Sequence, residues 1–323
     1  MKSVLSRHWF LISLAIVLFV GLFAPPSWQA LADNRALRSG IVFSVLLITG
    51  LSLSPTAVWQ AIRHPTYALL AVLVNYGFIP LAAWGLSSLL SGELAVGLIV
   101  VAIAPSTVAS AAVWTRKAGG NDAVAVMVTV ITNMSCFLFI PFWLAITSQG
   151  MDVELDPVAL TYKLALMVVL PMIIGQALRR SGQVATWADS HKSSLSTACQ
   201  CGVLSIVLMG AIRCGIQLET IGLGRVAGSV LVMLVLVVIL HLAALGVGYW
   251  LSGLAQFERP NRIAVTIAGS QKTLLVGLHV ALMVGGGLTV LPMVSYHVAQ
   301  LLIDTVVADR FSAGERRCLP WRA

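Results

Sequence analysis

Two short polar segments interrupt long apolar stretches of the sequence, and they carry residue types that bind small ligands or ions. The first is Ala104-Pro105-Ser106-Thr107, with Ser110 one turn further along the chain. A proline inside a helix frees backbone carbonyl groups, and such an interruption survives in lipid only where protein or a water-filled cavity surrounds it. Hydroxyl side chains beside freed carbonyls could hold a polar ligand. The same residues equally fit a kinked, continuous helix in which Ser and Thr bond their own backbone.

The second segment, Gly269-Ser270-Gln271-Lys272-Thr273, places a charged amine deep inside an apolar stretch. Lys272 lies about twelve residues from Pro260 and eleven from Met283, too far from either end for its side chain to reach the membrane surface easily. An ionisable group at that depth is costly and marks a function by default. We predict one of three roles for the amine: attraction of an anion, titration with a proton, or a fixed charge in the place of a cation.

Two residues of the apolar stretch at 121–147 extend this candidate site. Thr129 and Asn133 lie four residues apart and therefore share one helix face, and an amide within lipid needs a hydrogen-bond partner. Asn121 opens the same stretch and is a further candidate. Either Asn121 or Asp122 would also serve there as a helix cap.

The eighth and tenth apolar stretches carry two histidines and an aspartate. His297 lies three residues before Gln300, on the same helix face, and a binding role and a structural role fit it equally well. Asp304 follows, and we expect it near the cytoplasmic surface, whereas we interpret His241 as structural. The binding site predicted from the sequence comprises Pro105, Ser106, Thr107, Ser110, Asn121, Thr129, Asn133, Gly269, Ser270, Gln271, Lys272, Thr273 and His297, with no metal centre and no catalytic residue.

Membrane-spanning helices must position these residues. Apolar residues make up 59% of the 323 and charged residues only 10%, and a soluble fold this poor in charge would precipitate. Crossing a membrane takes about 20 residues of helix. We predict an all-α polytopic membrane protein of about ten transmembrane helices, at residues 9–24, 38–53, 67–90, 93–115, 121–147, 158–178, 193–212, 226–253, 260–283 and 286–308.

Basic residues between these stretches predict the orientation. With the N-terminus in the cytoplasm, the inner segments hold 14 Lys or Arg residues and the outer segments 5, namely Arg35, Arg38, Lys163, Arg213 and Arg225. The acidic connection from Gln149 to Pro157 then falls outside. Because basic residues concentrate on the cytoplasmic side, both termini are predicted to be cytoplasmic, in a bacterial inner membrane.

The ten stretches divide into two halves of five. Five is an odd number, so the second half must enter the membrane inverted with respect to the first. The two polar interruptions fall in the fourth and ninth stretches, which correspond to each other in the two halves. We therefore predict a first repeat at 1–147, an inverted repeat at 158–309 and a short basic cytoplasmic tail at 310–323. Broken helices in matching positions point to a binding site near the membrane midplane.

The N-terminal stretch has two interpretations. Lys2 and Arg7 precede an apolar run, and Ala30-Leu31-Ala32 looks like a small-residue cleavage site, which is the pattern of a secretory signal. A first transmembrane helix has much the same sequence. We favour the helix, because its removal would spoil the two-fold repeat.

Signatures of other protein classes are missing from the sequence. It contains no GxSxG elbow, HExxH pair or P-loop, and no basic stretch with interleaved aromatics that would bind nucleic acid. Its five cysteines form no CxxC pair and have no histidine at metal-ligand spacing. We interpret them as small core residues.

Four stretches together resemble a known family. They are Ala104-Pro105-Ser106-Thr107-Val108-Ala109-Ser110-Ala111, Ala118-Gly119-Gly120-Asn121, Gly269-Ser270-Gln271-Lys272-Thr273-Leu274, and Leu291-Pro292 through His297 to Leu301. In order and spacing they resemble the bile acid:sodium symporter superfamily, and more closely its bacterial SBF-like, or CPA-like, branch. The resemblance implies a panel domain and a core domain, with the fourth and ninth helices broken and crossing. It also implies alternating access through movement of one domain against the other.

The sequence departs from that family at the sodium ligands. The resemblance places Ala111 and Ala112 where sodium-coupled members have a Ser-Asn pair, and Ile267 where they have an acidic residue. Gln271 and Thr129 do match liganding positions. Two alanines and an isoleucine supply no side-chain oxygen, so the transporter fold is better supported than sodium coupling.

The sequence therefore predicts a secondary active transporter that moves a small organic anion, with a proton or sodium as coupling ion and no other cofactor. The alternatives are a cation/proton antiporter or metalloid efflux carrier on a related fold, and a membrane sensor that does not transport. The expected partners are the anion and the lipid bilayer, without nucleic acid, and the oligomeric state is left open.

Overall fold

The computed structural model describes residues 2–53, 65–107, 110–147 and 156–318. Within those ranges the protein is all-α, as the composition predicts, and contains no strand. Its helices are α1 (Lys2–Leu22), η1 (Pro26–Trp28), α2 (Gln29–Ala32), α3 (Arg35–Ser52), α5 (Pro65–Leu73), η2 (Val74–Phe78), α6 (Ile79–Ser87), α7 (Gly92–Ile103), α8 (Ser110–Lys117), α9 (Asp122–Thr147), α10 (Pro157–Leu164), η3 (Ala165–Val169), α11 (Leu170–Leu178), α12 (Gly182–Ser190), α13 (Lys192–Ile221), α14 (Leu223–Leu254), α15 (Arg259–Ser270), α16 (Leu274–Val284) and α17 (Val290–Cys318).

Eight spans in the described part of the chain are long and apolar enough to cross a membrane, and a ninth forms if α1 and the segment Pro26–Ala32, bent by 110° from it, are one span. This is fewer than the predicted ten. The predicted stretch at 93–115 is divided at the polar break into α7 and α8, and each piece is too short to qualify alone. The helix count therefore depends on the break.

The outer surface is apolar, as expected of helices that face lipid. On α14 the side chains of Leu231, Val235, Leu242 and Trp250 are 65%, 51%, 49% and 60% exposed. In a water-soluble protein such a large apolar surface would drive association, whereas the hydrocarbon of a bilayer accommodates it. The protein is therefore an integral membrane protein.

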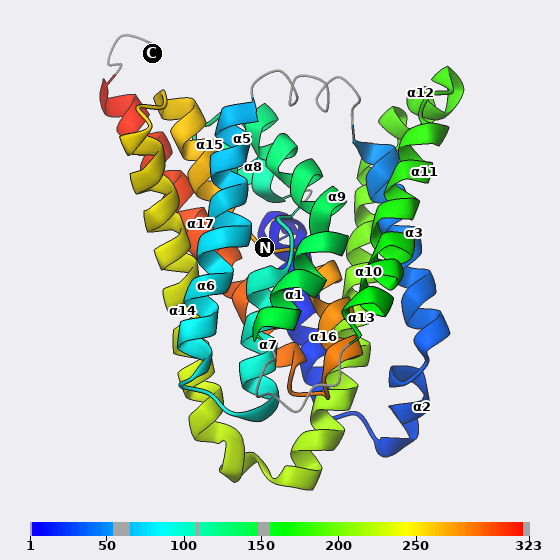
Figure 1. Ribbon diagram of the computed structural model, residues 1–323. Coiled ribbons are helices and arrows are strands. Elements are labelled where there is room, and N and C mark those ends of the chain that lie inside the picture. Colours follow the sequence, from blue (N-terminus) through cyan, green and yellow to red (C-terminus); the bar gives the residue numbers. More distant parts are fainter. Residues whose placement is uncertain (1, 54–64, 108–109, 148–155, 319–323) are drawn as a thin grey trace.

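The helices pack in two groups. The panel group consists of α1, α3 and α10–α13, and the core group consists of α5–α9 and α14–α17. Figure 1 shows α3 and α10–α13 on the right, and α5, α6, α14, α15 and α17 on the left. The two groups meet chiefly where α9 contacts α10 and where α13 contacts α16. Both polar breaks lie in the core group.

Two spans are widened by a single π turn that precedes a proline. The π segments η2 and η3 lie immediately before α6 and α11, whose second residues are Pro80 and Pro171. Because proline lacks a backbone N–H, the preceding turn cannot close in the usual way, and π turns of this kind are frequent at functional sites. The turn before Pro80 frees the carbonyl group of Asn75, which accepts a hydrogen bond from the second polar break.

The first helix belongs to the bundle. A Cβ atom added at Gly215 of α13 would lie 2.2 Å from the carbonyl oxygen of Leu22, and one added at Gly21 would lie 2.5 Å from Cβ of Ala211. The backbones of α1 and α13 therefore touch. This packing fits the interpretation of the first stretch as a transmembrane helix.

Helices α3 and α11 of the panel group also touch backbone to backbone, through two glycines. A Cβ atom at Gly50 would lie 2.5 Å from the carbonyl oxygen of Met172, and one at Gly175 would lie 2.5 Å from that of Leu47. Small residues allow helices in membranes to approach closely and to gain van der Waals contact.

We predict that Gly50→Ala and Gly175→Ala each destabilise the panel group by about 1–3 kcal/mol, because the added methyl group must push two backbones apart. The midpoint of thermal unfolding in detergent, followed by tryptophan fluorescence, measures this. Gly40→Ala on the same helix α3 is the control, because nothing lies within 4 Å of a Cβ atom there. Equal unfolding midpoints for all three variants would contradict the close contact.

Candidate functional site

The two polar breaks meet and cross, which confirms the expected pair of broken crossing helices. After α7 the chain is extended at Ala104, and between α15 and α16 it is extended at Gln271 and Thr273. The backbone N–H of Thr273 donates to the carbonyl oxygen of Pro105 at 2.8 Å. A direct backbone hydrogen bond thus joins segments about 170 residues apart in the chain.

Every carbonyl from Ala104 to Thr107, and that of Ala102, has a donor from outside its own helix. The acceptor and donor pairs are Ala102 with Lys272 at 2.5 Å, Ala104 with Lys272 at 2.9 Å, Pro105 with Thr273 at 2.8 Å, Ser106 with Asn133 at 2.9 Å, and Thr107 with Thr129 at 2.7 Å. The backbone carbonyl groups at a break within lipid must be hydrogen-bonded in this way, because no bulk water is at hand. The hydroxyl and amide side chains that the sequence singled out serve this purpose.

The backbone carbonyl groups of the second break are hydrogen-bonded in the same way. Its acceptor and donor pairs are Ala268 with Ser106 Oγ at 2.7 Å, Gly269 and Gln271 with Asn75 Nδ2 at 3.0 Å each, Ser270 with the Tyr296 hydroxyl at 2.8 Å, and Lys272 with Gln300 Nε2 at 3.1 Å. The Gln300 side chain also accepts from the Lys272 N–H at 3.0 Å. The two breaks therefore stabilise each other and are held by η2, α9 and α17.

Lys272 is fully buried, and its ammonium group is surrounded by oxygen atoms. Besides Ala102 and Ala104, it contacts the carbonyl oxygen and the side-chain oxygen of Asn75, at 2.8 and 3.1 Å. The ring of Tyr76 lies 5.6 Å away, within range of a cation–π contact. Of the three roles predicted from the sequence, this geometry favours a fixed positive charge that caps freed carbonyls.

The carbonyl of Asn75 is available because of Pro80. In an α-helix it would accept from the N–H of Ile79, but that N–H bonds to Val74 in the π turn. The next possible donor is residue 80, a proline without N–H. The ammonium of Lys272 donates to this carbonyl instead. A proline in one helix thus leaves a hydrogen-bond acceptor free for a lysine in another.

A pocket of about 490 Å³ lies beside the crossing, between the panel and core groups. Five of the predicted residues line it, namely Thr107, Ser110, Asn133, Thr273 and His297. Panel side chains complete the wall, among them Phe10, Thr49, Ser196, Cys199 and Gln200. The volume is in the usual range for a small-molecule site, and the wall is apolar with a few polar groups.

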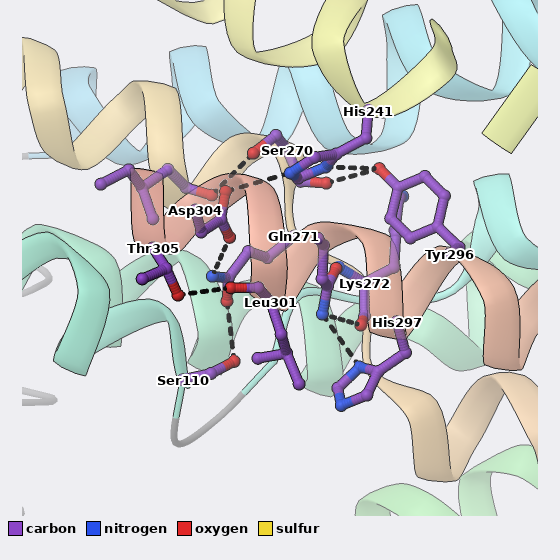
Figure 2. Close-up of polar contacts among 12 residues, drawn as sticks. Ser110, His241, Ser270, Gln271, Lys272, Tyr296, His297, Leu301, Asp304 and Thr305 are labelled. Carbon is purple, nitrogen blue, oxygen red and sulfur yellow. Dashed lines mark hydrogen bonds and ion pairs between the residues drawn. The ribbon is translucent and has the colours of Figure 1, made fainter. Parts of the chain in front are cut away.

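A buried chain of polar groups leads from this pocket into the core. Gln271 Oε1 accepts from the hydroxyls of Thr107 and Ser110 at 2.8 and 2.9 Å, and Gln271 Nε2 donates to Asp304 at 2.6 Å. Figure 2 shows the chain from Ser110 through Gln271 to Asp304 and His241. The other oxygen of Asp304 lies 3.0 Å from Nε2 of His241, and both side chains are fully buried.

The structure thus brings together all but one of the predicted site residues. Asn121 lies away from the pocket, at the end of the core group, where its side chain accepts from the N–H of Ala123 and donates to Asn261. This is the helix-cap geometry that the sequence left open. The next residue, Asp122, forms an ion pair with Arg116.

Sequence reasoning overlooked Asn75 and misplaced Asp304. Asn75, next to Tyr76 in an apolar stretch and five residues before Pro80, was the available signal. The expectation that Asp304 lies near the cytoplasmic surface is wrong for its side chain, which is 0% exposed. Its carboxylate reaches Gln271, whereas Ile267, which the resemblance places at the family's acidic position, packs among apolar side chains. An acidic group is therefore present at the crossing, on a different helix.

Comparison with known proteins identifies relatives over nearly the whole chain. The sequence profile of the SBF-like CPA transporter family matches residues 8–313. The chain is 30% identical to the Arabidopsis thaliana protein named "Probable sodium/metabolite cotransporter BASS4, chloroplastic", over 92% of this chain and 71% of that one. It is 24% identical to "Sodium/bile acid cotransporter 7-B" of Xenopus laevis, over 94% and 91% of the two chains. A Pseudomonas aeruginosa protein is 23% identical, over 94% and 92%.

We predict that Lys272→Met lowers the free energy of unfolding by about 2–5 kcal/mol, because each buried carbonyl left without a donor costs about 1–3 kcal/mol. Thermal unfolding of the purified protein in detergent measures this. Lys117→Met is the control, since Lys117 is partly exposed and pairs at the surface with Asp309, and such pairs contribute less than about 1 kcal/mol. Wild-type stability in Lys272→Met would contradict the role of the ammonium as a cap.

Proposed function

The chain belongs to the SBF-like CPA transporter family, and from this premise we propose that it is a secondary active transporter for a small organic anion. The observation that carries the proposal is the pocket at the crossing, which is lined by both helix groups and by residues of both breaks. A site between two groups of helices can open to one side of the membrane and then to the other when one group moves against the other. We propose this alternating access for the panel and core groups.

The chemistry of the pocket suits an anion with an apolar body. Among the described residues, its wall holds no Lys, Arg, Asp or Glu. Helices α8 and α16 both begin at it, with Ser110, Leu274 and Leu275 in the wall. The N-terminal end of a helix carries a partial positive charge that favours anions, and the apolar side chains between the panel and core groups would cover a hydrocarbon or ring.

For the membrane orientation we propose the arrangement with both termini in the cytoplasm of a bacterial inner membrane and with two inverted repeats of five spans. The excess of basic residues in the inner segments supports it. So does the matching place of the two breaks in the two halves of the chain.

We propose a proton as the coupling ion, bound by the pair His241 and Asp304. Sodium requires oxygen ligands that are free to coordinate. The one carboxylate at the crossing is occupied on both oxygens by N–H groups, those of Gln271 and His241. The relatives' names mention sodium, so the assay below compares the two ions directly.

The hydrogen bonds around His241 accommodate an extra proton. The hydroxyl of Tyr296 donates to the carbonyl of Ser270 at 2.8 Å, and its oxygen lies 3.2 Å from Nδ1 of His241. With protons on both ring nitrogens, Nε2 donates to Asp304 and Nδ1 donates to Tyr296, and every polar atom has a partner. A neutral ring with its proton on Nε2 would place two lone pairs face to face unless Tyr296 released Ser270.

Electrostatics would couple this proton to the anion. The protonated pair is neutral overall, and loss of the proton leaves one negative charge that only Gln271 separates from Thr107 and Ser110 in the pocket wall. In a medium of low dielectric constant that charge repels an anion. The charge of Lys272 is the same in both protonation states of the pair, so it does not alter this difference. Each ligand therefore raises the affinity for the other, which is the requirement for symport.

We predict gradient-driven uptake of an organic anion into proteoliposomes. A thermal-shift screen of pyruvate, benzoate and cholate selects the anion that stabilises the protein most, and its radiolabelled form is used for uptake with an imposed proton or sodium gradient. Thr107→Val and Ser110→Ala should each reduce uptake about tenfold, because a hydroxyl that turns from Gln271 to the anion forms a hydrogen bond to a charged ligand, which contributes about 1.5–3 kcal/mol. Thr197→Val is the control, because that threonine is exposed and bonds only its own helix turn in the described contacts. Equal uptake with and without protein rejects transport of these anions.

A second prediction separates coupling from binding. Asp304→Asn should abolish accumulation driven by a proton gradient while thermal stabilisation by the anion persists, because an amide cannot hold the paired proton. Asp309→Asn, on the same helix and in a surface pair with Lys117, should accumulate the anion like the wild type. Accumulation driven by sodium alone, unchanged in Asp304→Asn, would contradict proton coupling and leave the proposed transport intact.

A further inference from the structure

A second, larger cavity of about 740 Å³ lies at the opposite end of α16 from the pocket at the crossing. Leu274 and Leu275, at the start of α16, line the pocket, whereas His279, Leu282 and Met283 line this cavity. Its other walls come from α3, α10 and α13 of the panel group. The cavity is therefore bounded by both groups of helices, as the pocket is.

Four basic side chains line this cavity, namely Arg35, Arg38, Lys163 and Arg213, against one acidic side chain, Asp33. On the orientation proposed above, they are four of the five Lys or Arg residues on the outer side of the membrane. Basic residues are generally depleted there. The exceptions to the charge bias are thus gathered around one cavity instead of being scattered over the surface.

Two buried polar atoms at this cavity have no partner. Nε of Arg38 and Nδ1 of His279 make no hydrogen bond with any described residue, although their side chains are only 5% and 3% exposed. Leaving a buried polar atom without a hydrogen bond is costly. A ligand that supplies the missing partner removes this cost, which favours its binding. Asp33 is engaged with Arg213, at 3.3 Å, and does not fill this need.

We propose that this cavity is an anion-binding site for an organic carboxylate or sulfonate with an apolar body. Arg38 binds the acidic group from within the wall. Arg35, Lys163 and Arg213 surround it nearer the surface, and Met167, Leu282 and Met283 contact the apolar part. The site is distinct from the pocket at the crossing. It gathers the anion at one end of α16, and the other end of that helix lines the pocket. A funnel lined with charge of one sign raises the local concentration of the opposite ion.

Isothermal titration of the protein in nanodiscs of zwitterionic lipid tests the proposal, with 2-naphthoate as the probe and the uncharged 2-naphthalenemethanol for comparison. We expect 2-naphthoate to bind and the alcohol not to bind. Arg35→Gln combined with Lys163→Gln should weaken binding at this site about tenfold, and both residues are exposed, so the variant should fold. Arg225→Gln is the matched control, because it removes the fifth outer charge, which does not line the cavity. It should leave the affinity unchanged.

Variants of the two sites separate this inference from the proposed function. Thr107→Val combined with Ser110→Ala should leave binding at the outer cavity intact. If only that pair of changes weakens the binding of 2-naphthoate, the outer site is rejected and the proposed pocket is supported. Equal weakening by Arg225→Gln would show unspecific charge attraction and overturn the proposal. So would displacement of 2-naphthoate by phosphatidylglycerol in the nanodisc, which would assign the cavity to a lipid headgroup.

Discussion

The rest of this structure depends on one requirement, that every backbone carbonyl freed by the two broken helices finds a donor without bulk water. Leaving one buried acceptor unpaired costs about 1–3 kcal/mol, and the crossing contains ten such groups, five in each break. No single helix can supply the donors. They come from η2, α9, α17 and the opposite break, so the core group holds together as a unit around the crossing.

The same requirement explains the chemistry of the side chains that gather there. The ammonium group of Lys272 supplies several N–H donors from one nitrogen atom. This suits its position, because α7 ends there and the Asn75 carbonyl of η2 has no helical N–H donor at Pro80. The amide of Asn75 donates to two carbonyls of the second break and leaves its oxygen for Lys272. These groups are committed to the backbone, and the polar side chains that line the pocket are uncharged hydroxyls and amides together with His297. A rigid crossing beside an adaptable pocket is what movement of one group of helices past the other needs.

The sequence alone predicts the breaks, because a proline with hydroxyl neighbours and a lysine are both conspicuous in apolar stretches. It does not predict the partner of Lys272, since the vacancy at Asn75 arises from a π turn before a proline in a different helix. Asp304 was misplaced for a related reason. It lies four residues before the end of the apolar stretch predicted at 286–308, which suggests the surface, but α17 continues to Cys318 and packs against α14, where His241 lies. Burial depends on neighbours that one helix does not reveal. Asn121 shows the opposite error. It was predicted as a binding residue, but its role as a helix cap is enough to explain a polar side chain at that position.

The contrast between the two cavities bears on how an anion could be both captured and released. The outer cavity has an excess of three positive charges, since four basic residues face one acidic residue. In the part of the chain that the structure describes, the pocket at the crossing has no Lys, Arg, Asp or Glu in its wall, because the Lys272 ammonium binds backbone carbonyls and the His241–Asp304 pair lies behind Gln271. A pocket lined by formal charges would hold an anion tightly on both sides of the membrane. Hydroxyl groups and helix ends would hold it more weakly, so in the transport cycle proposed above a single proton on the buried pair would be enough to decide whether the anion stays or leaves.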